Sequence, residues 1–322
     1  MTRIVSFVIP VYNEEESLQP LFQQIAETTQ QLSHEWEVIF VDDGSTDGSW
    51  NVIRSLAAAN RRVRGIRFRR NFGKAAALSA GFQAAVGDPV VTLDADLQDD
   101  PHEIPKLLQA LEEGKDVVSG WKRIRHDPWH KVLASRVFNW VVSTMTGVRL
   151  HDHNCGLKCY RSAVFREIRL YGELHRFIPV LAAARGFRVG ELEIQHRPRP
   201  FGRSKYGIGR FVKGFLDLLT VKFITSYSHR PQHVLGSIGL LAFVLGGFGM
   251  TWLAVTWIIN EFRPGSYPPL HQRPLLIYAV ASVLLGLQML TMGFLAELFN
   301  AYSAHQRDEF SIAETTDASN SK

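Results

Sequence analysis

Cysteine is scarce in this chain, and the two cysteines do not form a recognisable metal site. Only Cys155 and Cys159 occur among 322 residues. His151 and His153 lie close to them in the sequence, but the spacing fits none of the common zinc patterns. We therefore expect reduced, structural cysteines, as is usual in a cytoplasmic domain.

Charge is absent from two long stretches in the last third of the chain. No charged residue occurs in 234–259 or in 274–296, and each run exceeds the roughly 20 residues that cross a bilayer as a helix. A buried core helix can be equally apolar, but two such runs in tandem favour two membrane spans. Both lie too far from Met1 for a cleaved signal, so we expect the front domain to stay in the cytoplasm.

Acidic residues are nearly absent from the segment before the first apolar run. Between Arg197 and Arg230 the chain carries many basic residues and only Asp217 against them. This is either the positive flank of a cytoplasmic membrane boundary or a segment that binds phosphate. The net charge of +5 is modest, and we expect no nucleic-acid partner. Arg263 and Arg273 lie between the two apolar runs and weaken the orientation argument; we expect a hairpin with both ends in the cytoplasm.

The first half of the chain alternates strand-like and helix-like segments, without internal repeats. This order predicts an α/β domain with a mostly parallel sheet. The expected strands are 4–11, 36–41, 63–68, 89–93 and 116–119, and the expected helices are 17–31, 48–59, 74–85 and 101–112.

Two later segments, at about 129–146 and 207–227, have amphipathic patterns. Each is either packed against the domain or placed at the lipid headgroups. The expected organisation is a cytoplasmic domain over 1–230 that includes these interface helices, a two-helix membrane hairpin over 231–300, and a polar cytoplasmic tail over 301–322.

Polar residues gather directly after three of the predicted strands. They are Asn13 with Glu14, Asp42 with Asp43, and Asp94 with Asp96. In open α/β sheets ligands bind at the edge formed by the strand ends, so three such clusters indicate one pocket.

The cluster after the fourth predicted strand predicts a cation site. Asp94 and Asp96 occupy alternate positions, so their carboxylates can share one hard cation, and Gln98 can add an oxygen or a water-mediated contact. Two acids at a strand end can instead be turn and cap residues, but the neighbouring acidic clusters favour a cation.

The other polar segments leave alternatives open. Asp42 and Asp43 suit hydrogen bonding to a base or ribose, while Asp47 is either a helix cap or a ligand. The segment 69–74 precedes a helix start and either holds a diphosphate or caps and solvates the turn.

Several long motifs together resemble the inverting glycosyltransferases of family 2. They are PVYNE at 10–14, VDDGSTDGS at 41–49, NFGKAAALSAGF at 71–82 and DADLQDDP at 94–101. The resemblance covers about residues 1–230 and implies the GT-A fold, a nucleotide-binding α/β domain with a mostly parallel sheet.

Within that family the chain is similar to the polyprenyl-phosphate glycosyltransferases, which include dolichyl-phosphate mannose synthase and the GtrB-type and ArnC-type enzymes. The matching segments are DHNCGLKCYR at 152–161, HRFIP at 175–179, FGRSKY at 201–206 and the two apolar runs.

The resemblance also implies roles for particular residues. Mg²⁺ or Mn²⁺ would be held by Asp94, Asp96 and Gln98. Donor or lipid-phosphate contacts would come from Pro10, Tyr12, Glu14, Asp42, Asp43, Lys74, Asp94, Ala95, Gln98, Arg176 and Ser204. The catalytic set would be Asp152, Asp96, Arg203 and Lys205.

The expected reaction is transfer of a hexose from a UDP-glucose-type or GDP-mannose-type donor to undecaprenyl or dolichyl phosphate. It would occur at the cytoplasmic face of the inner membrane, in a multi-pass protein that can form a homo-oligomer. A phosphate monoester has a second pKa of about 6 and hardly needs a general base. We therefore expect Asp152 to orient the substrate rather than to abstract a proton.

Other functions fit the sequence less well. A processive polysaccharide synthase would carry a QxxRW motif, which this sequence lacks. An inactive membrane scaffold would have no reason to keep the acidic clusters. A dinucleotide-dependent oxidoreductase is disfavoured because Gly207 and Gly209 neither follow a strand nor precede a third glycine of the expected motif.

Overall fold

The structure is a computed structural model. It describes residues 4–30, 32, 34–124, 129–168, 170, 172, 174–198, 200, 214, 216–222, 225 and 231–304. The chain divides into two compact units, residues 1–222 and 223–322, and each is described by itself.

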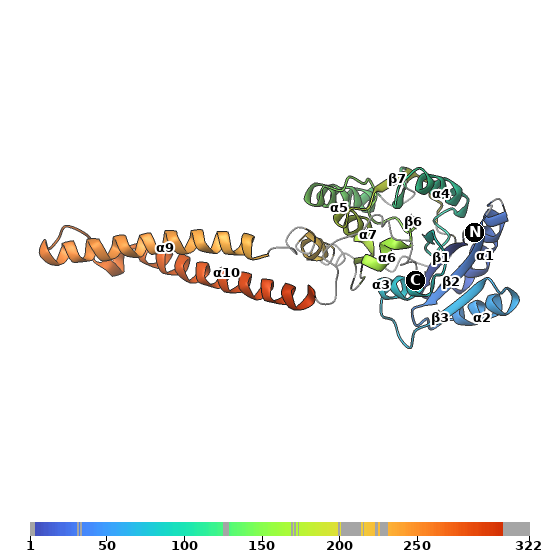
Figure 1. The fold of residues 1–322 in the computed structure, drawn as a ribbon, viewed down its shortest axis with the longest axis horizontal. Coiled ribbons are helices and arrows are strands. Elements are labelled where there is room, and N and C mark those ends of the chain that lie inside the picture. The colour runs from blue at the N-terminus through green and yellow to red at the C-terminus, as the bar shows by residue number, and fades with distance from the viewer. Residues whose placement is uncertain are drawn as a thin grey trace, which may run out of the picture. The chain divides into compact units, whose positions relative to one another are not determined.

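The first unit is built on a seven-stranded sheet with the order β3-β2-β1-β4-β6-β5-β7 (Figure 1). Strands β1 to β4 pair in parallel, β6 runs antiparallel to both β4 and β5, and β7 is parallel to β5. The sheet is therefore mostly parallel, as the sequence predicts. The strands are β1 (Ile4–Val11), β2 (Glu35–Asp42), β3 (Val63–Arg67), β4 (Val90–Thr92), β5 (Val117–Trp121), β6 (Lys158–Tyr160) and β7 (Val189–Glu193).

Helices connect the strands. They are α1 (Glu15–Gln30), α2 (Ser49–Ala59), α3 (Lys74–Ala84), α4 (Ile104–Glu112), α5 (Trp129–Thr146), α6 (Ala163–Glu167) and α7 (Ile178–Ala184). Helices α1 to α5 lie close to the predicted positions, whereas α6 and α7 were not predicted. Two short 3-10 turns, η1 (Pro101–Glu103) and η2 (Leu174–Phe177), precede α4 and α7. The predicted helix over 101–112 thus begins as a 3-10 turn, which Asp100 caps by accepting a hydrogen bond from the His102 amide at 3.0 Å.

Both faces of the sheet are covered by helices, which explains why the central strand β1 is almost continuously apolar. Phe7 and Ile9 of β1 belong to a buried cluster with residues of α1, α2 and α4. Val8 points to the opposite face, where it packs with Ala77 and Leu78 of α3. Burial of each such side chain contributes about 1.5–3 kcal/mol. A one-residue slip would exchange the two faces, so the register and the positions of the strand ends are fixed.

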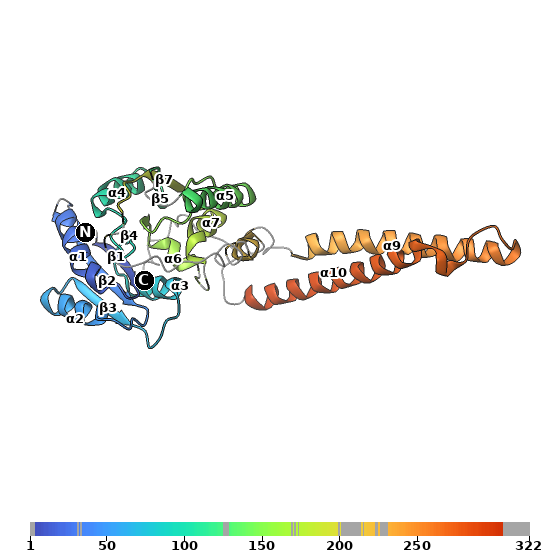
Figure 2. The ribbon, with the colours of Figure 1, turned by 180° about the vertical axis from the view of Figure 1, so that it is seen from behind.

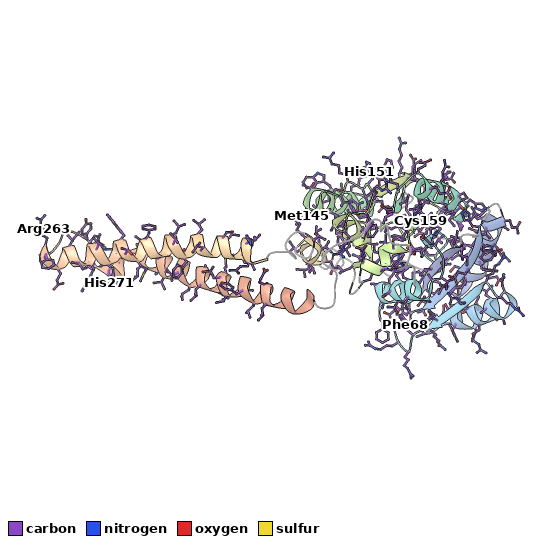
Figure 3. The ribbon with its side chains drawn as sticks, in the orientation of Figure 1. Phe68, Met145, His151, Cys159, Arg263 and His271 are labelled. Carbon is purple, nitrogen blue, oxygen red and sulfur yellow. The ribbon has the colours of Figure 1, made fainter. Side chains whose placement is uncertain are left out.

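Strands β6 and β7 are the part of the sheet that the sequence did not predict. β6 is three residues long and lies between β4 and β5, with Cys159 opposite Val91 and Val118. Cys159 is fully buried and unpaired, in agreement with the structural role expected for the cysteines (Figure 3). Because β6 is antiparallel, its beginning lies at the same edge as the ends of β4 and β5.

The second unit contains the two apolar segments as long helices, α9 (Pro231–Phe262) and α10 (Pro274–Ala304). They lie side by side in both views (Figures 1 and 2). The ranges Gln232–Phe262 and Pro274–Leu298 are long and apolar enough to cross a membrane, each with a mean hydropathy of 2.0. These two helices are therefore candidate membrane spans.

Close contact between α9 and α10 depends on small residues. A Cβ atom added to Gly286 would lie 2.6 Å from the carbonyl oxygen of Gly239, so the two backbones meet there. Ser282 donates a hydrogen bond across the pair to the carbonyl of Ala242 at 2.8 Å. Such close backbone contact is typical of helix pairs in membranes.

The connection between α9 and α10 contains the 3-10 turn η3 (Leu270–Gln272) and is marked by Arg263 and His271 in Figure 3. Arg273, predicted to complicate the orientation argument, donates from Nε to the carbonyl of Pro268 at 2.8 Å. Its charge therefore also serves to close the turn.

Candidate functional site

The loops after β1 and β2 are joined by hydrogen bonds. The amide of Asn13 donates to Ser45 Oγ at 2.9 Å, and Asn13 Oδ1 accepts from the Thr46 amide at 2.8 Å. The amide of Glu14 donates to Ser49 Oγ at 3.0 Å. Tyr12, Asn13 and Glu14 thus extend from the end of β1 at the edge where β2 also ends.

The acidic side chains after β2 accept hydrogen bonds from backbone amides. Buried Asp42 accepts from the amide of Ser45 at 2.8 Å, and its other oxygen lies 3.5 Å from Arg67 Nε. Asp47 accepts from the amide of Ser49 at 3.0 Å and from the amide of Glu15 at 3.3 Å. Asp47 therefore accepts the first amides of both α1 and α2 in this structure.

Asp43 connects the end of β2 to the turn that leads into α3. Its two carboxylate oxygens accept from the amides of Phe72 and Gly73 at 2.7 and 2.9 Å. Burial raises the pKa of Asp43 above its usual value, while these two amides oppose the rise. The turn starts beyond Phe68 (Figure 3) and leaves Lys74 as the first residue of α3. The amides of 72 and 73 are thus engaged by Asp43.

The acidic side chains after β4 face lysines instead. Asp94 forms an ion pair with Lys74. Burial acts to raise the pKa of Asp94, but Lys74, with smaller contributions from Lys122 and His175, lowers it to about 2. Asp94 is therefore ionised throughout the neutral range. Asp96 follows buried Ala95, and its Oδ1 accepts from the amide of Gln98 at 3.2 Å.

A second lysine pairs with a second buried carboxylate beside Asp94. Lys122 Nζ lies 2.6 Å from Asp99 Oδ1, and the Asp99 side chain is 1% exposed. Burial opposes the charge of Lys122, but Asp99 raises the pKa of Lys122. Gly156 lies between the acids: an added Cβ would be 2.5 Å from Asp94 Oδ2 and 2.8 Å from Asp99 Oδ2. A side chain at position 156 would therefore collide with both.

A small cavity of about 20 Å³, the size of one water molecule, opens beside Asp94. Charged and titratable side chains from four separate parts of the chain meet there: Lys74, Asp94, Lys158, His175 and Arg176. Burial, with Lys74 and Arg176, holds the pKa of His175 well below its usual value. The remaining lining is Pro10, Leu78, Thr92, Leu93, Asn154, Cys155, Gly156 and Tyr160.

Lys158, in β6, fixes the loop before that strand. Its buried Nζ donates to the carbonyls of His153 and Cys155 at 3.1 and 2.6 Å. Burial lowers the pKa of Lys158. The ammonium thus holds the loop that carries Asp152 against the end of β4.

The backbone around Asp152 is held from several sides. Asn139 of α5 donates from Nδ2 to the carbonyl of His151 at 2.7 Å, and its Oδ1 accepts from the His153 amide at 3.3 Å. Ser119 donates to the carbonyl of Asp152 at 3.3 Å. The Asp152 side chain is buried and accepts from the amide of Asn154 at 3.0 Å. His151 remains at the surface (Figure 3).

The structure brings several predicted site residues to one edge of the sheet. Pro10, Lys74, Asp94 and Arg176 line the cavity, Asp96 and Gln98 follow Asp94 in the same loop, and Tyr12, Glu14, Asp42 and Asp43 lie at the neighbouring strand ends. Arg203, Ser204 and Lys205 lie outside the residues that the structure describes.

Three residues of this region were not singled out from the sequence: Lys122, Lys158 and Asn139. Lys158 belongs to the motif DHNCGLKCYR at 152–161, so the motif could have identified it as a site residue. No sequence motif points to Lys122 or Asn139, because their partners lie in other segments of the chain.

The donor atoms after β4 suit a hard divalent cation. Among the residues that the structure describes, no three His, Cys, Asp or Glu side chains are grouped to hold a metal ion. Mg²⁺, however, is usually held by one or two carboxylates together with substrate phosphates and water. Asp94 and Asp96 provide that number of carboxylates, and the low pKa of Asp94 keeps it ionised.

The topology and the acidic edge define a GT-A transferase fold, and sequence comparison gives the family. The model of the family described as Glycosyl transferase family 2 matches residues 6–169. The chain belongs to glycosyltransferase family 2.

Two curated relatives are similar over nearly the whole chain. A dodecaprenyl-phosphate galacturonate synthase from Rhizobium johnstonii is 38% identical, with 91% of this chain and 87% of the relative covered. An undecaprenyl-phosphate 4-deoxy-4-formamido-L-arabinose transferase from Aeromonas hydrophila is also 38% identical, with 92% and 88% covered.

Solved structures are similar over 69% of this chain. Mannosyl-3-phosphoglycerate synthase from Rubrobacter xylanophilus matches with a TM-score of 0.54 at 18% identity, over 74% of its own chain. Glucosyl-3-phosphoglycerate synthase from Mycobacterium tuberculosis, in complex with Mn²⁺ and uridine-diphosphate-glucose, matches with a TM-score of 0.51 at 21% identity, over 79% of its chain. At these identities the likeness shows the fold.

Proposed function

We propose that this chain transfers a sugar from a nucleotide-sugar to a polyprenyl phosphate, with inversion at the anomeric carbon. The observation that carries the proposal is the convergence of Asp94 with Lys74 and Arg176 beside one cavity at the sheet edge. Such a set of charges suits a substrate with phosphate groups. The two curated relatives, matched over about nine-tenths of this chain, are named for sugar transfer to polyprenyl phosphates.

The donor's diphosphate would lie at the end of β4. Asp94 and Asp96 would hold Mg²⁺ or Mn²⁺, with Gln98 as a further oxygen donor, and the cation would neutralise charge on the leaving nucleoside diphosphate. Lys74 and Arg176 supply positive charge beside the same cavity. Tyr12, Asp42 and Asp43, at the ends of β1 and β2, are the side chains that we propose to lie near the nucleoside.

The acceptor supplies its own nucleophile. A phosphate monoester with a second pKa of about 6 is largely dianionic at neutral pH, so it attacks without a general base. Asp152 is buried, and its backbone is held by Asn139 and Ser119, which suits a group that orients the substrate. Arg203, Ser204 and Lys205 are proposed to complete the phosphate contacts.

The membrane arrangement follows from the two apolar helices. We propose that α9 and α10 form a hairpin in the inner membrane, that residues 1–230 lie on its cytoplasmic face, and that the tail over 301–322 is also cytoplasmic. Such a placement would give the transferase domain access to a phosphate at the membrane surface. A homo-oligomer is compatible with this arrangement.

The test is sugar transfer by the purified full-length protein to undecaprenyl phosphate. The donor panel would contain radiolabelled UDP-glucose, UDP-galacturonate, GDP-mannose and a nucleotide-linked 4-deoxy-4-formamido-L-arabinose. We expect labelled lipid from one donor with Mn²⁺ or Mg²⁺, and none with EDTA. Absence of transfer from every donor by folded protein would contradict the proposal.

The role of Asp152 has its own test. Asp152→Asn should reduce turnover while the pH dependence of the remaining rate keeps its shape. If the variant binds both substrates and metal normally but loses a pH-dependent limb of the rate profile, Asp152 is a base and the orienting role is wrong.

A further inference from the structure

The ion pair between Lys74 and Asp94 differs in exposure from the other lysine contacts around the cavity. The side chains of Lys74 and Asp94 are 27% and 32% exposed. Those of Lys122 and Asp99 are 14% and 1% exposed. Lys158 is buried with its ammonium bonded to two carbonyls. Of these three lysines, Lys74 is therefore the one whose partner is most accessible to a dissolved ion.

Lys74 reaches Asp94 because the preceding turn is fixed. Both oxygens of Asp43 accept amides of that turn, and Gly73 has a φ of 95°, a conformation that favours glycine. The turn also packs tightly on the β2 loop: a Cβ added to Gly44 would lie 2.4 Å from the carbonyl carbon of Arg70. The backbone of Lys74 is thus fixed, and its flexible four-carbon stem can redirect the ammonium.

We propose that Lys74 is an exchangeable counter-ion. Its ammonium neutralises Asp94 in the cation-free protein, and it turns to the donor's diphosphate when a divalent cation takes Asp94. The inference rests on the proposed function only in assigning a diphosphate-containing donor to the end of β4, beside this cavity. Asp43 acts through Lys74 here, as a positioning residue that holds the turn.

The exchange follows from competition for one carboxylate. A divalent cation and the ammonium of Lys74 would both use the negative charge of the Asp94 carboxylate, one oxygen of which Lys74 now contacts. A partly exposed ion pair contributes little net free energy, so a divalent cation can displace the ammonium. The released ammonium is a compact charge that suits phosphate. Cation and diphosphate thereby strengthen each other's binding, and this coupling is reciprocal.

The first experiment is a double-mutant cycle on metal-free binding of pyrophosphate, used as a probe that carries no base or sugar. Pyrophosphate is titrated in EDTA into the full-length wild type, Asp94→Asn, Lys74→Met and the double variant. We expect Asp94→Asn to strengthen binding about tenfold when Lys74 is present, because Lys74 is then released. In the Lys74→Met background the same change should have a much smaller effect.

The cycle separates exchange from general electrostatics. Loss of the negative charge of Asp94 should change pyrophosphate affinity both with Lys74 present and in Lys74→Met. Release of Lys74 can change the affinity only when Lys74 is present. Equal effects of Asp94→Asn in the two backgrounds would overturn the proposal. The thermal unfolding midpoint of each variant confirms that folded proteins are compared.

The second experiment measures Mn²⁺ affinity of the protein without donor, by the loss of the free-ion electron paramagnetic resonance signal. Lys74→Met removes the competitor, so its Mn²⁺ affinity should rise about tenfold. The matched control is Lys106→Met. Lys106 lies in α4 and its Nζ is 2.6 Å from Glu103 Oε2, so its removal should leave the Mn²⁺ affinity unchanged. Unchanged or weaker Mn²⁺ binding by Lys74→Met would refute the exchange.

Neither experiment uses acceptor or sugar transfer. A protein that fails every transfer assay but shows both binding effects would disprove the proposed reaction and keep the exchange. A protein that transfers sugar but shows neither binding effect would support the proposed reaction and disprove the exchange.

Discussion

The acidic clusters after β2 and after β4 look alike in the sequence but have different surroundings. Asp42, Asp43 and Asp47 each accept hydrogen bonds from backbone amides of the loops around them. Asp94 and Asp99 face the ammonium groups of Lys74 and Lys122. Acids bound to backbone amides hold the chain in shape, whereas an acid in a partly exposed ion pair, such as Asp94 with Lys74, can exchange partners.

The pKa directions agree with this difference. Burial raises the pKa of Asp43, which has amides but no ammonium group against its carboxylate. Although burial acts the same way on Asp94, Lys74 lowers the pKa of Asp94 to about 2. The Asp94 carboxylate of the β4 cluster is thus kept ionised, and the β2 cluster is mainly a structural clamp.

The largest effect is expected from a substitution that disrupts the β4 cluster. Asp94→Asn should reduce kcat/KM for transfer about 10³-fold, the scale found when one group that stabilises developing charge is removed. Its thermal stability should change little, since the Lys74–Asp94 pair is partly exposed. Radiolabelled transfer and thermal unfolding on the same preparation test both statements. A variant that unfolds readily but keeps its turnover per folded molecule would reverse the assignment.

The next prediction concerns the histidines near the β4 cluster. Burial, with Lys158, lowers the pKa of His153 to about 4, so the folded protein keeps this ring neutral while the unfolded chain binds a proton near pH 6.5. The stability contribution is therefore complete above pH 6.5 and is lost as the pH falls towards 4. This group alone should cost on the order of 3 kcal/mol by pH 4.

Thermal unfolding between pH 7 and pH 4 checks the histidine prediction. His153→Gln should flatten the pH dependence, whereas His271→Gln, at an exposed position in the α9–α10 connection, should not. Identical slopes for wild type and His153→Gln would show that another group controls the acid response.

A smaller effect should follow from breaking the β2 clamp. Asp43→Asn keeps one acceptor oxygen and places an amide against the other backbone donor, which leaves one part-buried N–H without an acceptor. We expect a loss of about 1–2 kcal/mol in stability, with a smaller loss of turnover than in Asp94→Asn. Denaturant titration gives the first number and the transfer assay the second. A loss of turnover without a loss of stability would show that Asp43 contacts the substrate and does not stabilise the turn.

The smallest effect is expected at Asn139, which fixes the loop of Asp152. Asn139→Ala removes both hydrogen bonds on either side of that residue, and kcat should fall about tenfold while KM for the donor stays unchanged. Asn51→Ala, on an exposed position of α2, is the control. If KM rises and kcat holds, Asn139 supports binding and does not position Asp152.

Much of the first unit could be predicted from sequence, and the exceptions have physical reasons. Strand β1 was predicted at its observed bounds because eight consecutive residues are almost all buried. β6 was missed because three residues between two partner strands carry too little local pattern. Its lysine, Lys158, is also a residue type that is rarely buried unless it has partners.

The site was predicted at the level of residue types and strand ends, but not at the level of partners. The motif DADLQDD gives no sign that Lys74, 20 positions earlier, pairs with Asp94. Nor does VDDGSTDG show that Asp43 binds amides about 30 positions later. These pairings depend on the parallel order of β1, β2 and β4, which only the folded sheet supplies.

The reversed direction of β6 has a consequence for how such a protein can diversify. The loops after β1, β2 and β4 leave the sheet at the site edge, whereas the loop with Asp152 arrives there, after a long excursion through α5. Only three residue pairs join β6 to β4. The stretch between β5 and β6 can therefore gain or lose residues without shifting the register of the first four strands. The stretch between β5 and β6 can thus differ in length among related chains, beside four strands whose register stays the same.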